Sequence, residues 1–206
     1  MPRVIRNISV VAVTTAVCLF LAGWADTLDG VKRDLADIKS LSCDFRQKKT
    51  TPLLAKPLVS EGRMYFQAPS SIKWEYTKPF RDVLVLDKGK SLHYSIDEGG
   101  TKKVIEDNSP ARTVIFEEIA GWLQGNFESR NFKAVLKQGK PRLIVLTPKA
   151  KGVSSFVTKI DLALSDRPGI IDYIKIHEKE NASTVLEFRN IELNGKIDAA
   201  VFRMEE

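Results

Sequence analysis

Cysteine and histidine are scarce in this sequence, with two of each among 206 residues. Cys18 lies in an apolar N-terminal run that we expect to be removed, which leaves Cys43 alone in the mature chain. A disulfide within that chain is therefore excluded, packing has to supply the stability, and Cys43 is expected to be a small buried apolar residue. A structural zinc site needs four clustered Cys or His ligands, which one cysteine with the scattered His93 and His177 does not supply. We expect no metal and no cofactor.

Motifs for catalysis are missing as well. The G-x-S-x-G turn that presents the serine nucleophile of many acyl hydrolases does not occur. Glu117 and Glu118 are neighbours on a predicted helix, so their side chains point about 100° apart, which is typical of a solvated face. Gly99 and Gly100 lack the following lysine and serine of a phosphate-binding loop and indicate a turn. We therefore expect a protein that is not an enzyme.

Long apolar runs are absent beyond the N-terminus, where one extends over residues 8–21. Arg3 and Arg6 precede this run, and Gly23 and Ala25 follow it as the small residues of a cleavage site. The run is too short for a comfortable membrane span. The pattern predicts a signal peptide over residues 1–25, cleaved to give an exported protein.

Charge of one sign is not in large excess either. Residues 26–206 have the length of one domain that can bury a full core. Without Arg3 and Arg6 the 32 basic residues fall to 30, against 26 acidic ones, which gives a formal net charge of +4. The two signs are interspersed, which indicates an ordinary solvated surface and leaves attraction to anionic head groups open. No basic helix stripe or zinc-finger spacing is present, so no nucleic-acid partner is expected.

The segment from Gly62 to Pro79 is the most informative part of the chain and predicts a β-hairpin. Its alternation with a period of two places five apolar side chains on one face: Met64, Phe66, Ile72, Trp74 and Tyr76. Such a face is either ordinary core packing or one wall of a ligand cavity.

Apolar residues at three- and four-residue steps predict two helices. The first covers residues 26–39, and the second begins after Ser109, with Pro110 suited to the first helical turn, and continues to Gly125. Runs of period two between turn residues predict strands over residues 41–46, 58–67, 72–77, 83–86, 92–96, 103–105, 132–136, 143–147, 157–164, 170–176, 185–188 and 201–204.

Many short strands with two helical interruptions indicate a mainly β fold, built as a meandering antiparallel sheet. A sheet of that many strands tends to curl. We predict an open antiparallel half-barrel, an incomplete β-barrel with an α-helical lid on its concave face.

This architecture suggests a cavity for acyl chains between sheet and lid. The residues expected to line it are Met64, Phe66, Ile72, Trp74, Tyr76, Leu84, Leu86, Ile115, Ile119, Trp122 and Leu123. A lid that moves aside on loading would exchange one set of apolar contacts for another. A filled core gives the same sequence pattern, so composition does not separate the two.

Several motifs, in this order, resemble the LolA family, the periplasmic carriers of outer-membrane lipoproteins in Gram-negative bacteria. They are SCDFRQ from Ser42, the hairpin with G-x-M-Y-F and IKWEY, LVLDKGKSLHY from Leu84, LTPKA from Leu146 and DAAVF from Asp198. The resemblance implies an open half-barrel with a helical lid and no cofactor. It also implies a monomer that accepts acylated lipoproteins or lipids from an inner-membrane ABC lipoprotein exporter and delivers them to an outer-membrane lipoprotein receptor.

Two positions depart from the family pattern. Well-studied members carry an arginine just before the proline that matches Pro69, where it helps to hold the lid closed, and here Ala68 stands. An aromatic residue often follows three positions after that proline, and here it is Ile72. The departures keep a second reading open, a divergent periplasmic regulator that senses lipid or lipoprotein on the same scaffold. A periplasmic enzyme is a third reading, which the missing catalytic residues disfavour.

Overall fold

The computed structural model describes residues 27–105 and 110–204. The predicted signal peptide and the predicted helix cap at Ser109 lie outside these residues. Within the described ranges, no helix is long and apolar enough to cross a membrane.

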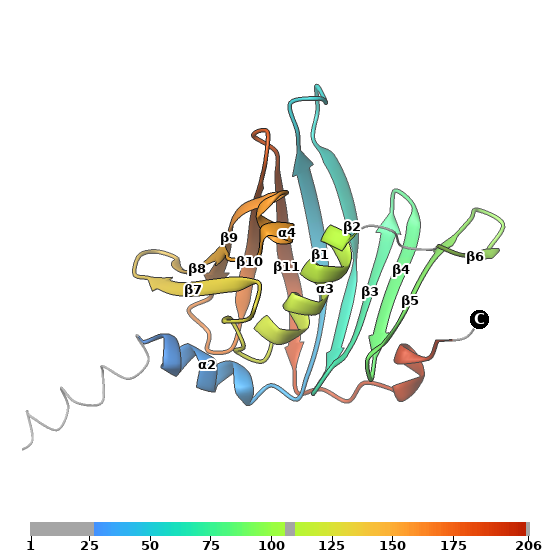
Figure 1. Ribbon diagram of the computed structural model, residues 1–206. Helices are drawn as coiled ribbons and strands as arrows, with labels where there is room; N and C mark the ends of the chain where they lie inside the picture. Colours follow the sequence, from blue (N-terminus) through green and yellow to red (C-terminus); the bar gives the residue numbers. More distant parts are fainter. Residues whose placement is uncertain (1–26, 106–109, 205–206) are drawn as a thin grey trace, which may run out of the picture.

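One antiparallel sheet of eleven strands dominates the molecule and curves around a helix (Figure 1). Its strands are β1 Ser40–Thr50, β2 Leu58–Gln67, β3 Ser71–Lys78, β4 Arg81–Asp87, β5 Lys90–Ile96, β6 Lys102–Val104, β7 Phe132–Lys137, β8 Arg142–Pro148, β9 Val157–Leu164, β10 Ile171–Glu178 and β11 Ser183–Leu193. The strand order is β6-β5-β4-β3-β2-β1-β11-β10-β9-β8-β7. Because β6 and β7 are free edges, the sheet is open, which confirms the predicted mainly β half-barrel.

The first and the last strand of the chain pair with each other at the centre of the sheet. Strand β1 pairs with β2 on one side and with β11 on the other, from Leu41 opposite Leu193 to Thr50 opposite Ser183. All other neighbours in the sheet are consecutive strands of the chain. The sheet therefore consists of an N-terminal half, β1 to β6, and a C-terminal half, β7 to β11, which meet at this single pairing.

The first helix, α2 (Leu28–Ala36), lies along one end of the sheet (Figure 1). The Thr27 hydroxyl caps it by accepting a hydrogen bond from the Gly30 amide at 3.1 Å. Val31 and Leu35 are buried as their spacing predicted. The helix ends at Ala36, before the expected end at residue 39, and Asp37 is its C-cap residue. Ile38 nevertheless remains buried in the core.

The second helix, α3 (Pro110–Trp122), crosses the concave face of the sheet (Figure 1). Its position confirms the predicted helical lid. A one-turn helix, α4 (Lys151–Ser154), follows β8 and was not predicted. It is too short to show a helical period in the sequence.

The predicted strand at residues 201–204 is wrong. The structure has a 3₁₀ helix there, η1 (Ala199–Phe202), capped by the Asp198 carboxylate, which accepts a hydrogen bond from the Ala200 amide at 2.9 Å. This helix lies against β3 and β4 and buries Phe202. Val83 and Val85 of β4 are also buried, although they alternate with the residues that face the main core. The C-terminal segment therefore covers part of the outer face of the sheet.

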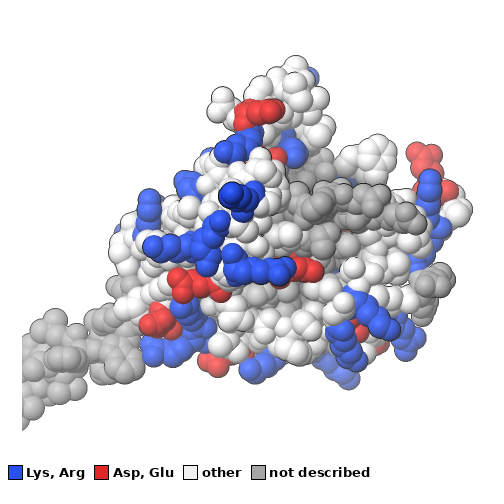
Figure 2. Space-filling model, in the orientation of Figure 1, with Lys and Arg blue, Asp and Glu red and all other residues white. Residues whose placement is uncertain are grey.

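The surface carries mixed charge, as predicted. On the face shown in Figure 2, acidic side chains are interspersed among the basic ones.

The loop between β1 and β2 protrudes from one end of the sheet, and its Leu53 is 88% exposed.

Candidate functional site

The concave face of the sheet and the inner face of α3 enclose one hydrophobic cluster. All eleven residues that the sequence nominated for the cavity belong to it. Seven are buried and four are partly buried against the rest: the former are Met64, Phe66, Ile72, Trp74, Ile119, Trp122 and Leu123, and the latter Tyr76, Leu84, Leu86 and Ile115. The structure thus brings the predicted residues together.

Aromatic rings form the sheet side of the cluster. Trp74 of β3 packs against Phe45 of β1, with ring centroids 4.4 Å apart. Tyr76 meets Phe45 edge to face at 5.2 Å, and its hydroxyl donates a hydrogen bond to the Gln47 side-chain oxygen at 2.9 Å. Tyr76 therefore places its ring in the apolar layer and its polar tip at the boundary of that layer.

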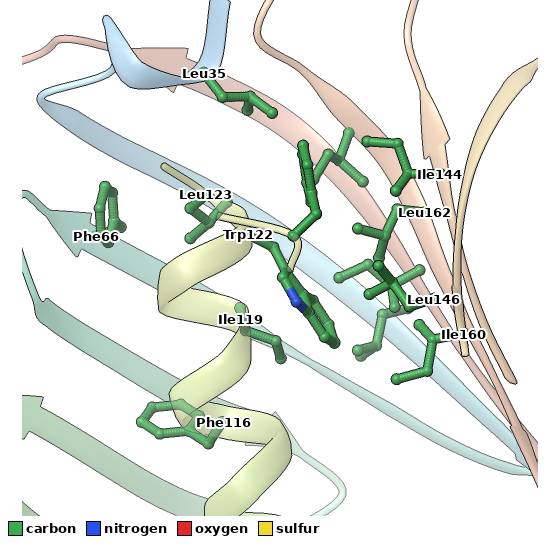
Figure 3. Packing of buried hydrophobic residues seen from close by; sticks show 14 of the residues in the cluster. Leu35, Phe66, Phe116, Ile119, Trp122, Leu123, Ile144, Leu146, Ile160 and Leu162 are labelled. Carbon is green, nitrogen blue, oxygen red and sulfur yellow. The ribbon is translucent and has the colours of Figure 1, made fainter. Parts of the chain in front are cut away.

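Residues at helical spacing on α3 form the lid side. Trp122 is fully buried and reaches from the helix toward the strands that carry Leu146, Ile160 and Leu162 (Figure 3). Its ring lies edge-on to Phe132 at 5.9 Å. The lid thereby contacts the C-terminal half of the sheet, whose residues the sequence did not nominate.

One lid residue was missed. Phe116 is buried, and its ring lies edge-on to Trp74 at 6.5 Å, so it joins the lid to the aromatic wall. Its spacing of three to Ile119 is the helical signal that identifies it.

A small cavity lies at the end of α3, beside Trp122. The cavity there has a volume of about 20 Å³, room for about one water molecule. It lies between α2, α3 and the strands of both sheet halves and is lined by Leu35, Leu41, Cys43, Met64, Ile119, Trp122, Leu123, Gly169, Ile170, Ile171, Ile174, Phe188 and Ile191. In the described conformation Phe116, Ile119, Trp122 and Leu123 are buried in the cluster, so the helix is closed over the sheet.

A polar contact joins the end of the lid to the sheet. The Gln124 side-chain amide donates hydrogen bonds to the Pro69 carbonyl oxygen at 2.6 Å and to the Ala120 carbonyl oxygen at 3.0 Å. Pro69 lies in the turn between β2 and β3, next to Ala68, where the resemblance places a lid-holding arginine. The structure shows a lid contact at the same turn, with the polar side chain supplied by the lid.

A second set of hydrogen bonds fixes α3 to the loop that follows it. Glu118 accepts hydrogen bonds from the Ser129 hydroxyl and from the Asn131 side-chain amide, both at 2.8 Å. These bonds lie within the segment that carries the lid. They therefore stabilise the conformation of that segment and do not attach α3 to the concave face.

Cys43 and the two histidines, which were singled out in the sequence, are buried or hydrogen-bonded to a neighbouring side chain. Cys43 is buried, as predicted, and burial raises the pKa of its thiol to about 12. His93 and His177 lie on strands and pair with carboxylates of the neighbouring strands, Asp82 and Asp161, each at 2.8 Å. In residues 27–105 and 110–204, no three or more His, Cys, Asp or Glu side chains gather as a metal site would require.

Comparison with protein families gives a match over most of the chain. The family model for the outer membrane lipoprotein carrier protein LolA matches residues 36–205. The outer-membrane lipoprotein carrier protein of Chromohalobacter salexigens is 26% identical over 176 residues, which are 83% of this chain and 79% of that protein. The carrier protein of Bordetella avium is 24% identical over 205 residues, covering 97% of this chain and 92% of the relative.

Solved structures share the fold at low identity. A DUF1329 family protein from Desulfovibrio piger is similar with a TM-score of 0.50 and 10% identity, over 89% of this chain and 96% of that one. An uncharacterized conserved protein from Thermus thermophilus is similar with a TM-score of 0.50 and 9% identity, over 87% and 92%.

Proposed function

Because the chain belongs to the family of outer membrane lipoprotein carrier proteins, LolA, we propose that it binds the acyl chains of lipoproteins between its sheet and α3. In this proposal it is a periplasmic carrier that moves lipoproteins from the inner to the outer membrane. The observation that carries the proposal is the apolar layer between the lid and the concave face, which contains all eleven nominated residues.

The closed conformation supports a lid that exchanges with cargo. The side chains of α3 fill the space that an acyl chain would take, so the empty carrier exposes little of its apolar wall to water. An entering chain replaces contacts of Phe116, Ile119 and Trp122 with its own. Each buried methylene contributes about 0.8 kcal/mol, so about ten methylenes supply about 8 kcal/mol before the cost of moving the lid.

The partners follow from the proposed role. An inner-membrane ABC lipoprotein exporter would load the open carrier, and an outer-membrane lipoprotein receptor would empty it. The family resemblance supports both partners, and the predicted signal peptide supports export to the periplasm.

A release assay tests the carrier function. Purified residues 26–206 are added to spheroplasts that synthesise a lipoprotein, and the supernatant is analysed after ultracentrifugation. The acylated lipoprotein is expected in the supernatant as a complex with the carrier. The same lipoprotein made without its acylated cysteine is the control for binding to the polypeptide alone. The readout is the amount of cargo that co-purifies with the carrier. Equal amounts of acylated and non-acylated cargo bound to the carrier, or no acylated lipoprotein bound to it, contradict the proposal.

A pair of variants places the binding in the apolar layer. Ile115→Glu puts a charge on a half-buried lid residue, and Val135→Glu makes the same change at a residue of β7 that is 48% exposed. We expect Ile115→Glu to lose release activity, because burying a charge against an acyl chain is costly, while Val135→Glu keeps it. Circular dichroism of both variants checks that each is folded.

A further inference from the structure

Two buried tryptophans have hydrogen-bond donors without acceptors. Trp74 is 4% exposed and Trp122 is fully buried. The indole Nε1 of each is shielded from solvent and has no hydrogen-bond partner in the part of the chain that the structure describes. An indole N–H only donates, and a buried one usually finds an acceptor, so two orphaned donors in one cluster require an explanation.

The two donors lie on opposite sides of the proposed binding layer. Trp74 is on β3, where Phe45 packs against it and Phe116 of the lid covers it. Trp122 is the last residue of α3 (Figure 3), and it lines the small cavity. Sheet and lid therefore each contribute one neutral donor to a layer that is mostly apolar.

The chemistry of the surroundings limits the acceptor. None of the residues that line the cavity beside Trp122 is charged. Trp74 packs against the rings of Phe45, Tyr76, Phe116 and Phe188, which are uncharged as well. A carboxylate, as in a free fatty acid, would have to give up its hydration without a counter-ion, which is costly. A carbonyl oxygen is neutral and only accepts, so it satisfies an indole N–H at little cost.

We propose that Trp74 and Trp122 donate hydrogen bonds to the carbonyl oxygens of the ester or amide bonds through which acyl chains are attached to the cargo. The site then recognises the acyl linkage and not hydrocarbon alone. This inference rests on the proposed carrier function. It adds that the site distinguishes cargo by the carbonyl groups of the acyl linkage. Pure hydrocarbon of equal length leaves both donors unsatisfied and binds more weakly.

Two lipids that differ only in their carbonyl groups test the inference. One is a diacylglycerol with two ester-linked hexadecanoyl chains, and the other carries two ether-linked hexadecyl chains. Their affinities for residues 26–206 are measured in detergent below its critical micelle concentration by displacement of a fluorescent acyl probe. We expect the ester lipid to bind about tenfold more tightly, the size of about one net buried hydrogen bond to a donor otherwise left unpaired.

Variants assign the preference to the two indoles. Trp74→Phe and Trp122→Phe keep an aromatic ring and remove the N–H, so the ratio of ester to ether affinity should fall toward one. Phe116→Leu is the matched control. It disturbs the same layer without removing an N–H donor, so it should weaken the binding of both lipids equally and leave the ratio of their affinities unchanged.

An NMR measurement locates the bond directly. The sequence has three tryptophans, and Trp24 lies in the predicted signal peptide, so residues 26–206 give two indole N–H signals. Both proton signals should move downfield with the ester lipid and not with the ether lipid.

The outcomes separate this inference from the proposed function. Tight binding of both lipids with equal affinity overturns the inference and leaves the carrier function standing. An ester preference of unchanged size in both tryptophan variants also overturns it, because the preference then arises elsewhere. Failure of both lipids to bind contradicts the carrier function itself.

Discussion

The hydrogen bond between Gln124 and the Pro69 carbonyl should control how readily the lid opens. The bond is 2.6 Å long and joins the end of α3 to the turn between β2 and β3. Replacement of Gln124 by alanine removes it without changing the apolar layer. A hydrogen bond of this kind has a net worth of about 1 kcal/mol, so the ratio of open to closed lid should rise about fivefold. While the closed state predominates, the apparent dissociation constant falls by the same factor.

Titration with a fluorescent acyl probe measures this change. We expect Gln124→Ala to bind the probe about fivefold more tightly than the unchanged protein, while its thermal unfolding midpoint falls slightly. Gln67→Ala is the control, because the Gln67 side chain also donates to a backbone carbonyl, that of Lys39 at 3.1 Å, but lies outside the lid. It should leave probe affinity unchanged. If Gln124→Ala binds the probe no more tightly than Gln67→Ala, the bond does not set the lid equilibrium.

Four further predictions concern stability and reactivity. Leu162→Ala, at a fully buried position of β9, should lower the free energy of unfolding in urea by about 2–5 kcal/mol, whereas Leu53→Ala, on the exposed loop, should change it by less than about 0.5 kcal/mol. Gly62→Ala should cost about 3 kcal/mol in the same assay, because its Cβ would lie 2.1 Å from the Glu75 carbonyl oxygen, while Gly152→Ala meets nothing within 4 Å and should be tolerated. Cys43 should resist iodoacetamide at pH 8 in the native protein and react once urea unfolds it, as mass spectrometry can follow. The pKa of its thiol is raised by burial from 9.0 to about 12, so the unfolded chain loses this proton first, and stability should fall as pH rises through that window.

The sequence was most informative where burial follows a local period. Strand β2 begins and ends at the predicted residues, and its Met64 and Phe66 face the core as their alternation indicated. The lid was found for the same reason, since the face of a helix recurs every three to four residues.

The sequence was least informative where distant segments decide the outcome. Residues 199–202 form a 3₁₀ helix that lies against β3 and β4, more than a hundred residues away in the chain, and buries Phe202. The pairing of β1 with β11 is equally non-local. The size of the cavity could not be predicted either, because a space of about 20 Å³ depends on how Trp122 packs against side chains from α2, β1, β2, β10 and β11.

Helix α3 lies in the chain between the two edge strands of the sheet. The chain enters the lid from β6 and leaves it into β7, and these are the two free edges of the sheet. The helix therefore lies on the stretch of chain that connects the two free edges of the open sheet. A partner that binds at either edge of the proposed carrier would thus contact the chain next to the segment that bears the lid, without contacting the lid itself.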